Sequence, residues 1–349
     1  MLSKNEQDEL IKAAILAPSA DNSQPFKYQW QSSSNIDLWI DESRSGKASD
    51  NRFVLSDIAL GAVIENIVIH AASIKLSSNV KYFPNIKKDP RFVATIAFNK
   101  VLEQKDHDLA NAIPTRITDR RFPFKGPISK KIQKELQIAA QLNQSDLVWF
   151  NGKHEIKRVL PIIQKAESVR FKSEILHQEL FSTIDFNDQT IDEGMHISVL
   201  AVEKIAQPVF KQIKKWRVMN LLNKIGASTI LGLRSVKIPI LFSPALALIT
   251  INTNERVDVI KGGRAIQRVW LQATVNKLAI QPYAAPGIFS LGFIACEDEH
   301  TPELKIVQQK MNEIIVGNSY GLMFLRIGYN NRPIGSRTRR RNFHSFIKE

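Results

Sequence analysis

Two clusters of polar residues have the types and spacing needed to bind an anionic ligand. In the segment 116–121, Arg116, Thr118 and Arg120 alternate, so an extended backbone directs them to one side. Guanidinium groups bind phosphate through charge-assisted, often bidentate hydrogen bonds, and a threonine hydroxyl adds a donor. On spacing alone, a solvated basic turn is the simpler interpretation. Further arginines that could bind the same phosphate dianion follow in the turn and near the end of the chain: Arg121, Arg339, Arg340 and Arg341.

The second cluster is the segment 17–26, Ala-Pro-Ser-Ala-Asp-Asn-Ser-Gln-Pro-Phe. Asn22 and Gln24 offer both hydrogen-bond donors and acceptors, and Ser19 adds a hydroxyl. The pyrimidine edge of a flavin ring needs this mixture, because carbonyls and ring nitrogens alternate along it. The simpler interpretation is a loop at a helix end, in which polar side chains cap backbone groups.

The elements that must position these clusters recur in the same order in the two parts of the chain. Ser3 and Glu6 fit a capping box that starts a helix, and Pro18 ends that helix near residue 17. We expect two halves, 1–112 and 113–349, and an insertion at about 173–242 that has no counterpart in the first half. The first half is expected to contain strands at 27–31, 36–40, 80–83 and 92–98 and a buried helix at 53–74. In the second half, the proline–serine segment Pro127-Ile128-Ser129 is expected to start a helix. Strands are expected at 146–150, 245–251 and 322–327, further helices between 155 and 224, and a long helix at 256–277.

Composition excludes several classes of protein. The chain has 349 residues, 44% of them hydrophobic, a net charge of +14 and one cysteine, Cys296, so no internal disulfide can form. The histidines show no metal-ligand spacing, and phosphate loops of the Gly-x-Gly-x-x-Gly and Walker types are absent. The most hydrophobic stretch, 230–251, contains charges and prolines, so we expect soluble core or a lid, with a membrane-surface helix as a minor alternative. No membrane, nucleic acid or metal partner is expected, and the cytoplasm is the expected compartment.

Four segments together resemble the nitroreductase-like FMN-dependent superfamily. The Pro-Ser-x-x-Asn-x-Gln-Pro turn is similar to the motif after its first helix, and Arg-x-Thr-x-Arg-Arg-Phe at 116–122 is similar to its phosphate-binding segment. Residues 263–274 are similar to its central helix, and Arg-Ile-Gly-Tyr at 326–329 with the basic tail is similar to its final strand. The chain also resembles the subgroup in which two such halves are fused, typified by the mycobacterial protein Acg.

The resemblance implies an α+β fold with two nitroreductase-like halves forming an intrachain pseudo-dimer, each half a mixed sheet flanked by helices. One composite FMN site should survive, because the first half keeps the Ser19, Asn22 and Gln24 turn and the second keeps the phosphate arginines. Backbone around Pro286 and Gly287 resembles the loop that passes the flavin ring. Asp21 stands where the subgroup often has His, and a carboxylate near the flavin would disfavour its anionic reduced form.

The implied function is an FMN-dependent oxidoreductase that transfers hydride from NAD(P)H through FMN to an electron-poor small molecule, such as a nitroaromatic or a quinone. A monomer or a loose dimer is expected, because fusion removes the usual need to dimerise. Three alternatives stay open at this point. They are a protein that sequesters FMN or senses through it under a closed lid, a specialised flavin enzyme such as a peptide azoline oxidase, and, last, a nucleic-acid-binding module.

Overall fold

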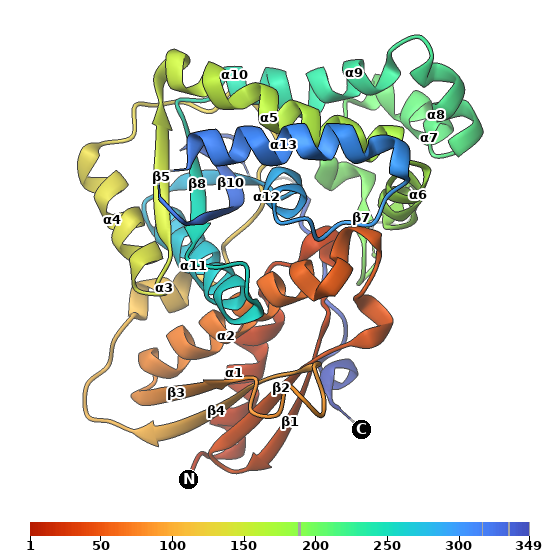
Figure 1. Cartoon of the computed structure of the whole chain (residues 1–349). Coiled ribbons are helices and arrows are strands. Elements are labelled where there is room, and N and C mark those ends of the chain that lie inside the picture. Colours follow the sequence, from red (N-terminus) through yellow and green to blue (C-terminus); the bar gives the residue numbers. More distant parts are fainter. Residues whose placement is uncertain (188–189, 316, 334–335, 349) are drawn as a thin grey trace.

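The computed structural model describes residues 1–187, 190–315, 317–333 and 336–348, and its architecture is α+β, as expected. Two four-stranded sheets lie in the two halves of the chain (Figure 1), with strand orders β1-β2-β4-β3 and β5-β8-β10-β9. The strands named in each sheet pair antiparallel. Isolated parallel bridges join Tyr28 to Ile347 and Thr118 to Ile280, so the sheets gain a mixed character at these points.

The N-terminal sheet is covered by helices on one face. Ser3 caps α1 in a complete capping box with Glu6, as the sequence predicts. β2 is almost entirely buried because Ile36, Leu38 and Ile40 pack against α1 and α2 on one face of the sheet. On the other face Trp39 stacks on Phe92 and lies under the Lys348 ammonium. The elements of this half are α1 (Lys4–Ile15), β1 (Phe26–Ser32), β2 (Asn35–Ile40), α2 (Val54–Ser73), β3 (Leu76–Tyr82), β4 (Phe92–Lys100) and α3 (His107–Ala112).

The C-terminal sheet has helices on both faces. All seven residues of its central strand β8 (Ala245–Ile251) are buried, which fits a strand covered on both sides. Ser129 caps α4 through its hydroxyl, as predicted from the Pro-Ile-Ser segment. The other elements are α4 (Lys130–Gln141), β5 (Asp146–Asn151), α5 (Gly152–Lys172), α11 (Arg256–Val275), β9 (Leu278–Tyr283), α12 (Ala285–Ser290), α13 (Thr301–Ile314) and β10 (Tyr320–Tyr329).

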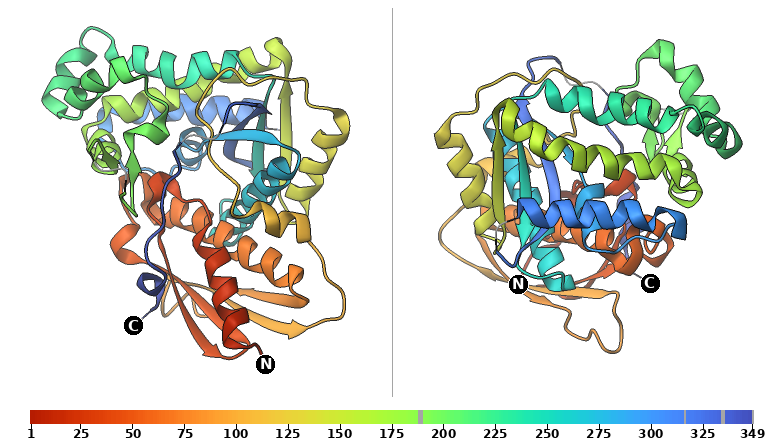
Figure 2. Two further views of the ribbon diagram at one scale, coloured as in Figure 1. Left: turned by 180° about the vertical axis from the view of Figure 1, so that it is seen from behind. Right: turned by 45° about the horizontal axis from the view of Figure 1, so that its top comes forward.

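Residues 173–242 lie between α5 and β8 as a group of short helices at the outer edge of the molecule (Figures 1 and 2). They form a small hydrophobic cluster with the end of α5, centred on Phe181, Ile213 and Met219. We call the described residues of the segment 173–242 the insertion. Its elements are α6 (Glu174–Ser182), β6 (Ile184–Asp185), β7 (Met195–His196), α7 (Gln207–Ile213), α8 (Trp216–Asn223), α9 (Ala227–Gly232) and α10 (Ile238–Leu241), with a π-helical turn at Leu233–Lys237.

The two halves meet where the long helices α2 and α11 cross. Gly61 and Gly263 face the opposite helix so closely that an added Cβ would lie 2.2 Å from the Ile260 carbonyl oxygen or 2.3 Å from that of Ile58. Beside this contact the fully buried Glu65 forms ion pairs with Arg264 and Arg268. Burial alone would lower the pKa of both arginines, but the charge of Glu65 outweighs it and raises the pKa of each. The crossing therefore needs two glycines and one buried charge cluster, and these join the two sheets into one body.

Helix α2 also accounts for the strongest hydropathy signal in the chain. Among the described residues, one helical stretch, Ala48–Ser73, has the length and hydropathy of a membrane span, and 78% of its most apolar window is buried inside the protein. Such burial is typical of the core helix of a globular domain.

After β10 the chain returns to the N-terminal half. The tail, dark blue in Figure 2, runs back to the N-terminal half and ends beside the edge strand β1. Phe346 stacks on Phe26 with ring centroids 4.6 Å apart, and Lys348 donates a backbone hydrogen bond to Tyr28. This return brings the tail arginines to the turn at residues 17–25.

Candidate functional site

The turn after α1 has a backbone that side chains rarely adopt. Asp21, Asn22 and Gln24 all have positive φ angles, of 49°, 58° and 51°. Asn and Asp tolerate the left-handed region, but Gln adopts it less readily, so surrounding contacts must hold this turn. One such contact is the Ser19 hydroxyl, which accepts a hydrogen bond from the Gln24 backbone N–H at 2.9 Å. The sequence-predicted ring-contacting turn is thus a rigid, strained segment.

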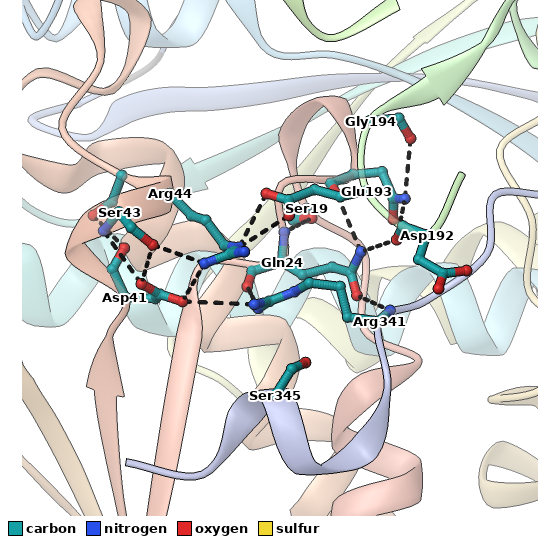
Figure 3. Close-up of polar contacts among 12 residues, drawn as sticks. Ser19, Gln24, Asp41, Ser43, Arg44, Asp192, Glu193, Gly194, Arg341 and Ser345 are labelled. Atoms are coloured by element: carbon teal, nitrogen blue, oxygen red, sulfur yellow. Dashed lines mark hydrogen bonds and ion pairs between the residues drawn. The ribbon is translucent and has the colours of Figure 1, made fainter. Parts of the chain in front are cut away.

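The side chains of this turn hold the insertion and the tail together (Figure 3). The Asn22 amide donates to the carbonyls of Gly194 (3.0 Å) and Arg339 (3.1 Å). The Gln24 amide donates to the Asp192 carbonyl at 2.7 Å, and its oxygen accepts from the Arg341 backbone N–H at 3.0 Å. The polar groups predicted to meet a flavin ring therefore have partners within the chain.

A second set of contacts fixes the same segment of the insertion. Arg44 pairs with Glu193 and with Asp41, each at 3.0 Å, and Arg341 lies 3.7 Å from Asp41 (Figure 3). Arg339 is largely exposed and pairs with Asp192 at 3.3 Å. Segment 192–194 is thus bound by side chains of both the first half and the tail.

The tail and the 116–121 turn bring together three cations near the end of α1. Arg116 is 8% exposed, its guanidinium lies 4.6 Å above the Trp270 ring, and it donates to the Leu16 carbonyl at 3.3 Å. Arg340 donates to the carbonyls of Ile15 (3.0 Å) and Ala17 (3.4 Å). Arg337 donates to the carbonyls of Pro114 and Thr115. We call Arg116, Arg337 and Arg340 the arginine cluster.

The electrostatics of the arginine cluster are unbalanced. Its members bind only neutral acceptors, and none forms an ion pair with another described residue. Burial, together with the charges of Arg340 and Arg337, lowers the pKa of Arg116 to about 9, and burial lowers that of Arg340 to about 10. The Nε atom of Arg116 is buried without a hydrogen-bond partner in the described structure. Arg116 and Arg340 therefore carry positive charge in a poorly solvated place, without a counter-charge from another described residue.

The other predicted phosphate ligands separate into two groups. Thr118 and Arg120 line a cavity, where Arg120 donates to the Val199 carbonyl at 3.1 Å and to the Met195 sulfur at 3.7 Å. Burial lowers the pKa of Arg120, and the carboxylate of Asp21 acts in the opposite direction. Arg121 points elsewhere, since it makes a two-bond pair with Asp119 at 2.8 and 2.9 Å and donates to Pro333.

The predicted loop residues Pro286 and Gly287 lie in α12 and are buried. An added Cβ on Gly287 would lie 1.9 Å from the Leu322 carbonyl oxygen, so this residue serves the packing of α12 on β10. Their neighbours Ala284, Ala285 and Ile288 line the cavity instead.

The cavity has a volume of about 570 Å³, within the range of roughly 300–1,000 Å³ that is typical of small-molecule sites. Both halves and the insertion contribute to its mostly apolar wall. Trp270, on which the Arg116 guanidinium stacks, is part of that wall, but Arg116, Arg337 and Arg340 are not themselves among the lining residues. The polar groups that face it include Ser19, Asp21, Thr118, Arg120, Glu167, Arg170, Gln281 and Tyr283.

Sequence reasoning missed several of these groups. Arg170 lies three residues after Glu167 on α5 and pairs with it at 3.3 Å. Burial disfavours the charge of Arg170, but the carboxylates of Glu167, Asp21 and Glu179 outweigh it and raise its pKa. Tyr283 donates to the Ser235 carbonyl, and burial raises its pKa, so its hydroxyl keeps its proton. A spacing of three on a helix with mixed polarity is common, so no local signal singles these residues out. Among the described residues, no cluster of His, Cys, Asp and Glu could hold a metal ion.

Comparison with known proteins gives weak similarities. No family model matches the chain. It is 26% identical over 284 residues to an uncharacterized protein of Mycobacterium tuberculosis, covering 81% of this chain but 39% of that protein. A second uncharacterized M. tuberculosis protein is 30% identical over 128 residues, which are 37% of its length. The chain thus spans less than two fifths of these relatives. An M. tuberculosis protein described as “Putative NAD(P)H nitroreductase” is 24% identical over 278 residues, 79% of this chain and 75% of that protein.

Solved structures show a limited global likeness. The FMN-dependent nitroreductase NfnB of Mycobacterium smegmatis, in complex with NADPH, has a TM-score of 0.39 and 14% identity, and the match covers 69% of this chain and 97% of that one. A nitroreductase with bound FMN from Desulfitobacterium hafniense has a TM-score of 0.36 and 11% identity, with coverage of 69% and 97%. At such scores neither structure defines the site of this chain.

Proposed function

We propose that this chain binds one FMN and acts as an FMN-dependent oxidoreductase of the nitroreductase type, with NAD(P)H as reductant and an electron-poor small molecule as acceptor. The observation that carries the proposal is the arginine cluster: the buried Arg116, the half-buried Arg340 and the exposed Arg337 lie near one another, and none of them pairs with a carboxylate of the described chain. A phosphate group is the counter-ion whose charge and geometry suit several guanidinium groups at once.

Magnitudes favour a bound anion over a purely structural role. The carbonyls at the C-terminus of α1 attract cations, but a helix end contributes at most about 2 kcal/mol in a partly buried setting. An uncompensated buried charge costs several kcal/mol. The helix end therefore offsets only part of the cost of burying Arg116 and partly burying Arg340, and a phosphate would offset the rest.

The residues present fit an FMN in part. The arginine cluster would hold the phosphate, and the cavity behind Trp270, with Ser19, Thr118 and Arg120 on its wall, offers space for the ring. Asn22 and Gln24 do not face that space in the described conformation, since their amides bind the insertion. When bound, FMN supplies hydride transfer between NAD(P)H and the acceptor. The chain would orient the ring, exclude water from it and control access to it.

We further propose that the two halves form an intrachain pseudo-dimer of the fused type, with α2 and α11 as its interface, and that the protein is a cytoplasmic monomer or loose dimer. The recurring order of elements and the close crossing at Gly61 and Gly263 support this proposal. The single composite site then follows, because one half supplies the 17–25 turn and the other supplies Arg116.

A second candidate function is sequestration of FMN, or sensing through it, with little turnover. The contacts of segment 192–194 favour this candidate: Asn22, Gln24, Arg44 and Arg339 all bind it, so the insertion covers the turn. A cover held by that many polar contacts would restrict the approach of NAD(P)H.

Anaerobic reduction of the FMN-loaded protein separates the two candidates. NADPH or NADH is mixed with the holoprotein, and the loss of flavin absorbance is followed, with dithionite as the reference reductant. Rapid bleaching by a nicotinamide nucleotide supports the oxidoreductase. Bleaching by dithionite alone supports sequestration and contradicts the enzyme. Failure to load FMN contradicts both.

A further inference from the structure

The insertion has a one-sided charge composition. Residues 204–242 contain eight Lys or Arg, and residues 204–254 contain no Asp or Glu. All eight cations except Arg234, which pairs with Glu203, are exposed. None of the exposed seven forms an ion pair with another residue of the described chain. The insertion therefore carries a concentrated part of the protein's positive charge, free to meet an anionic partner.

Apolar side chains are exposed in the same segment. Of the eighteen large hydrophobic residues exposed in the described structure, eight lie between 205 and 242. Ile205 and Ile225 are 90% and 79% exposed. Single exposed apolar residues are ordinary, but a contiguous group marks an interaction surface.

Helical spacing places these residues in stripes. On and after α8, Arg217, Leu221, Lys224 and Ile225 are exposed at spacings of four, three and one, while Met219 on the opposite side is buried. Cations and apolar groups thus alternate along a single outward face.

The outer helix of the insertion shows the same arrangement. From α9 through the π-helical turn into α10, Ile230, Leu233, Lys237 and Leu241 are exposed at spacings of three, four and four. The opposite side packs on α5 through residues that include Val236. α8, α9 and α10 form the outer layer of the molecule in both views (Figures 1 and 2).

We propose that this face, residues 204–242, docks on the surface of an anionic phospholipid membrane. Exposed Leu and Ile side chains would enter the region between headgroups and acyl chains, while the flexible stems of Lys and Arg reach lipid phosphates. A nucleic acid would use the cations but leave the apolar groups in water. A second copy of the same face would place like charges against one another.

The cavity gives this docking a consequence. Among the residues that line the cavity, Glu203 and Val209 are the exposed ones; Val209 lies within the proposed face and Glu203 directly precedes it. Docking would therefore bring the apolar cavity next to the bilayer, from which an apolar acceptor could enter. From the sequence we expected no membrane partner, with a membrane-surface helix at 230–251 as a minor alternative, because that stretch contains charges and prolines. The fold shows that residues 245–251 are a buried strand and that the cations of the insertion lie beside exposed apolar groups.

Vesicle flotation tests the proposal with the whole 349-residue chain. Vesicles of phosphatidylcholine alone are compared with vesicles in which one third of the lipid is phosphatidylglycerol. We expect the protein to float with the anionic vesicles and not with the neutral ones. A triple variant, Lys215→Glu, Arg217→Glu and Lys224→Glu, should lower the partition coefficient at least about 100-fold. The double variant Ile225→Ser and Ile230→Ser should lower it at least about 10-fold.

Two control variants make the same change in charge or in apolar side chains at exposed positions outside the insertion. Lys130→Glu, Lys131→Glu and Lys134→Glu remove the same charge from exposed positions on α4, and Leu102→Ser with Leu142→Ser removes exposed apolar groups outside the insertion. These controls should bind as the wild type does, and all variants should keep the wild-type melting temperature because every changed residue is exposed. Equal losses in the α4 control would show general charge attraction and overturn the proposal. So would absence of flotation, or binding to DNA with no binding to vesicles.

Discussion

Replacing Arg116 with methionine separates a phosphate site from a structural contact. Methionine keeps an unbranched side chain that can pack on Trp270, with a sulfur–aromatic contact worth about 0.3–1.5 kcal/mol, but it removes the buried charge. A pKa lowered to about 9 means that burial of the charged form is unfavourable by roughly 3–5 kcal/mol. The change also gives up the stacking contact, about 2 kcal/mol, and a hydrogen bond of about 1 kcal/mol. The apoprotein of Arg116→Met should therefore be as stable as the wild type or up to about 3.5 kcal/mol more stable.

Binding of FMN should change in the opposite direction. Loss of one charge-assisted hydrogen bond to phosphate weakens binding by about 1.5–3 kcal/mol, or roughly 10–150-fold in Kd. Quenching of FMN fluorescence gives the Kd, and thermal unfolding of the apoprotein gives the stability. The matched variant is Arg121→Met in the same turn. It leaves the carboxylate of Asp119 buried without its guanidinium partner, so stability should fall by about 3 kcal/mol while FMN binding changes less. An Arg116→Met protein that is destabilised and binds FMN as tightly as the wild type would refute the phosphate assignment.

Three further changes test the junction of the halves and the cover. Glu65→Gln should lower the free energy of unfolding by about 3–5 kcal/mol at pH 7, because it leaves the buried charge of Arg264 without a carboxylate. Pairing with the two arginines lowers the pKa of Glu65 below its ordinary value of 4.5. The stability difference between variant and wild type should therefore be full above pH 4.5 and shrink as the pH falls through the lowered pKa. Gly263→Ala should destabilise by at least about 1–3 kcal/mol, measured by urea unfolding, because its Cβ would meet the Ile58 backbone; wild-type stability would contradict the described crossing. Asn22→Ala removes the hydrogen bonds to the carbonyls of Gly194 in the insertion and Arg339 in the tail. The insertion should then cover the turn less tightly, and NADPH should bleach the bound flavin faster. An unchanged rate would contradict a cover held by this turn.

Periodic patterns predicted the framework of the fold. The apolar run at 53–74, the alternating strands of the first hairpin and the Ser129 cap all appear where local sequence placed them. β9 was missed, and Pro282 within it is one reason, since proline argues against a strand unless that strand is at a sheet edge. β9 is such an edge, next to β10 alone among the named strands.

The candidate site was predictable as a set of residues but not as an arrangement. One motif in the first half, at 17–26, one at the start of the second half, at 116–121, and the basic tail named the arginines and amides that the fold brings together. Their partners could not be named, because Asn22 binds a carbonyl 172 residues away and Arg340 binds one 325 residues away. The same holds for the position of Arg121, whose pairing with Asp119 depends on how the turn closes.

The stoichiometry and selectivity of flavin binding test the central claim most directly. Protein stripped of flavin is titrated with FMN and, separately, with riboflavin, which has the same ring without the phosphate. The account predicts saturation at one FMN per chain, a protein-bound flavin spectrum, and riboflavin binding weaker by at least about 100-fold, because the arginine cluster contributes through the phosphate. A chain that takes up no FMN, or that binds riboflavin as tightly as FMN, would contradict it.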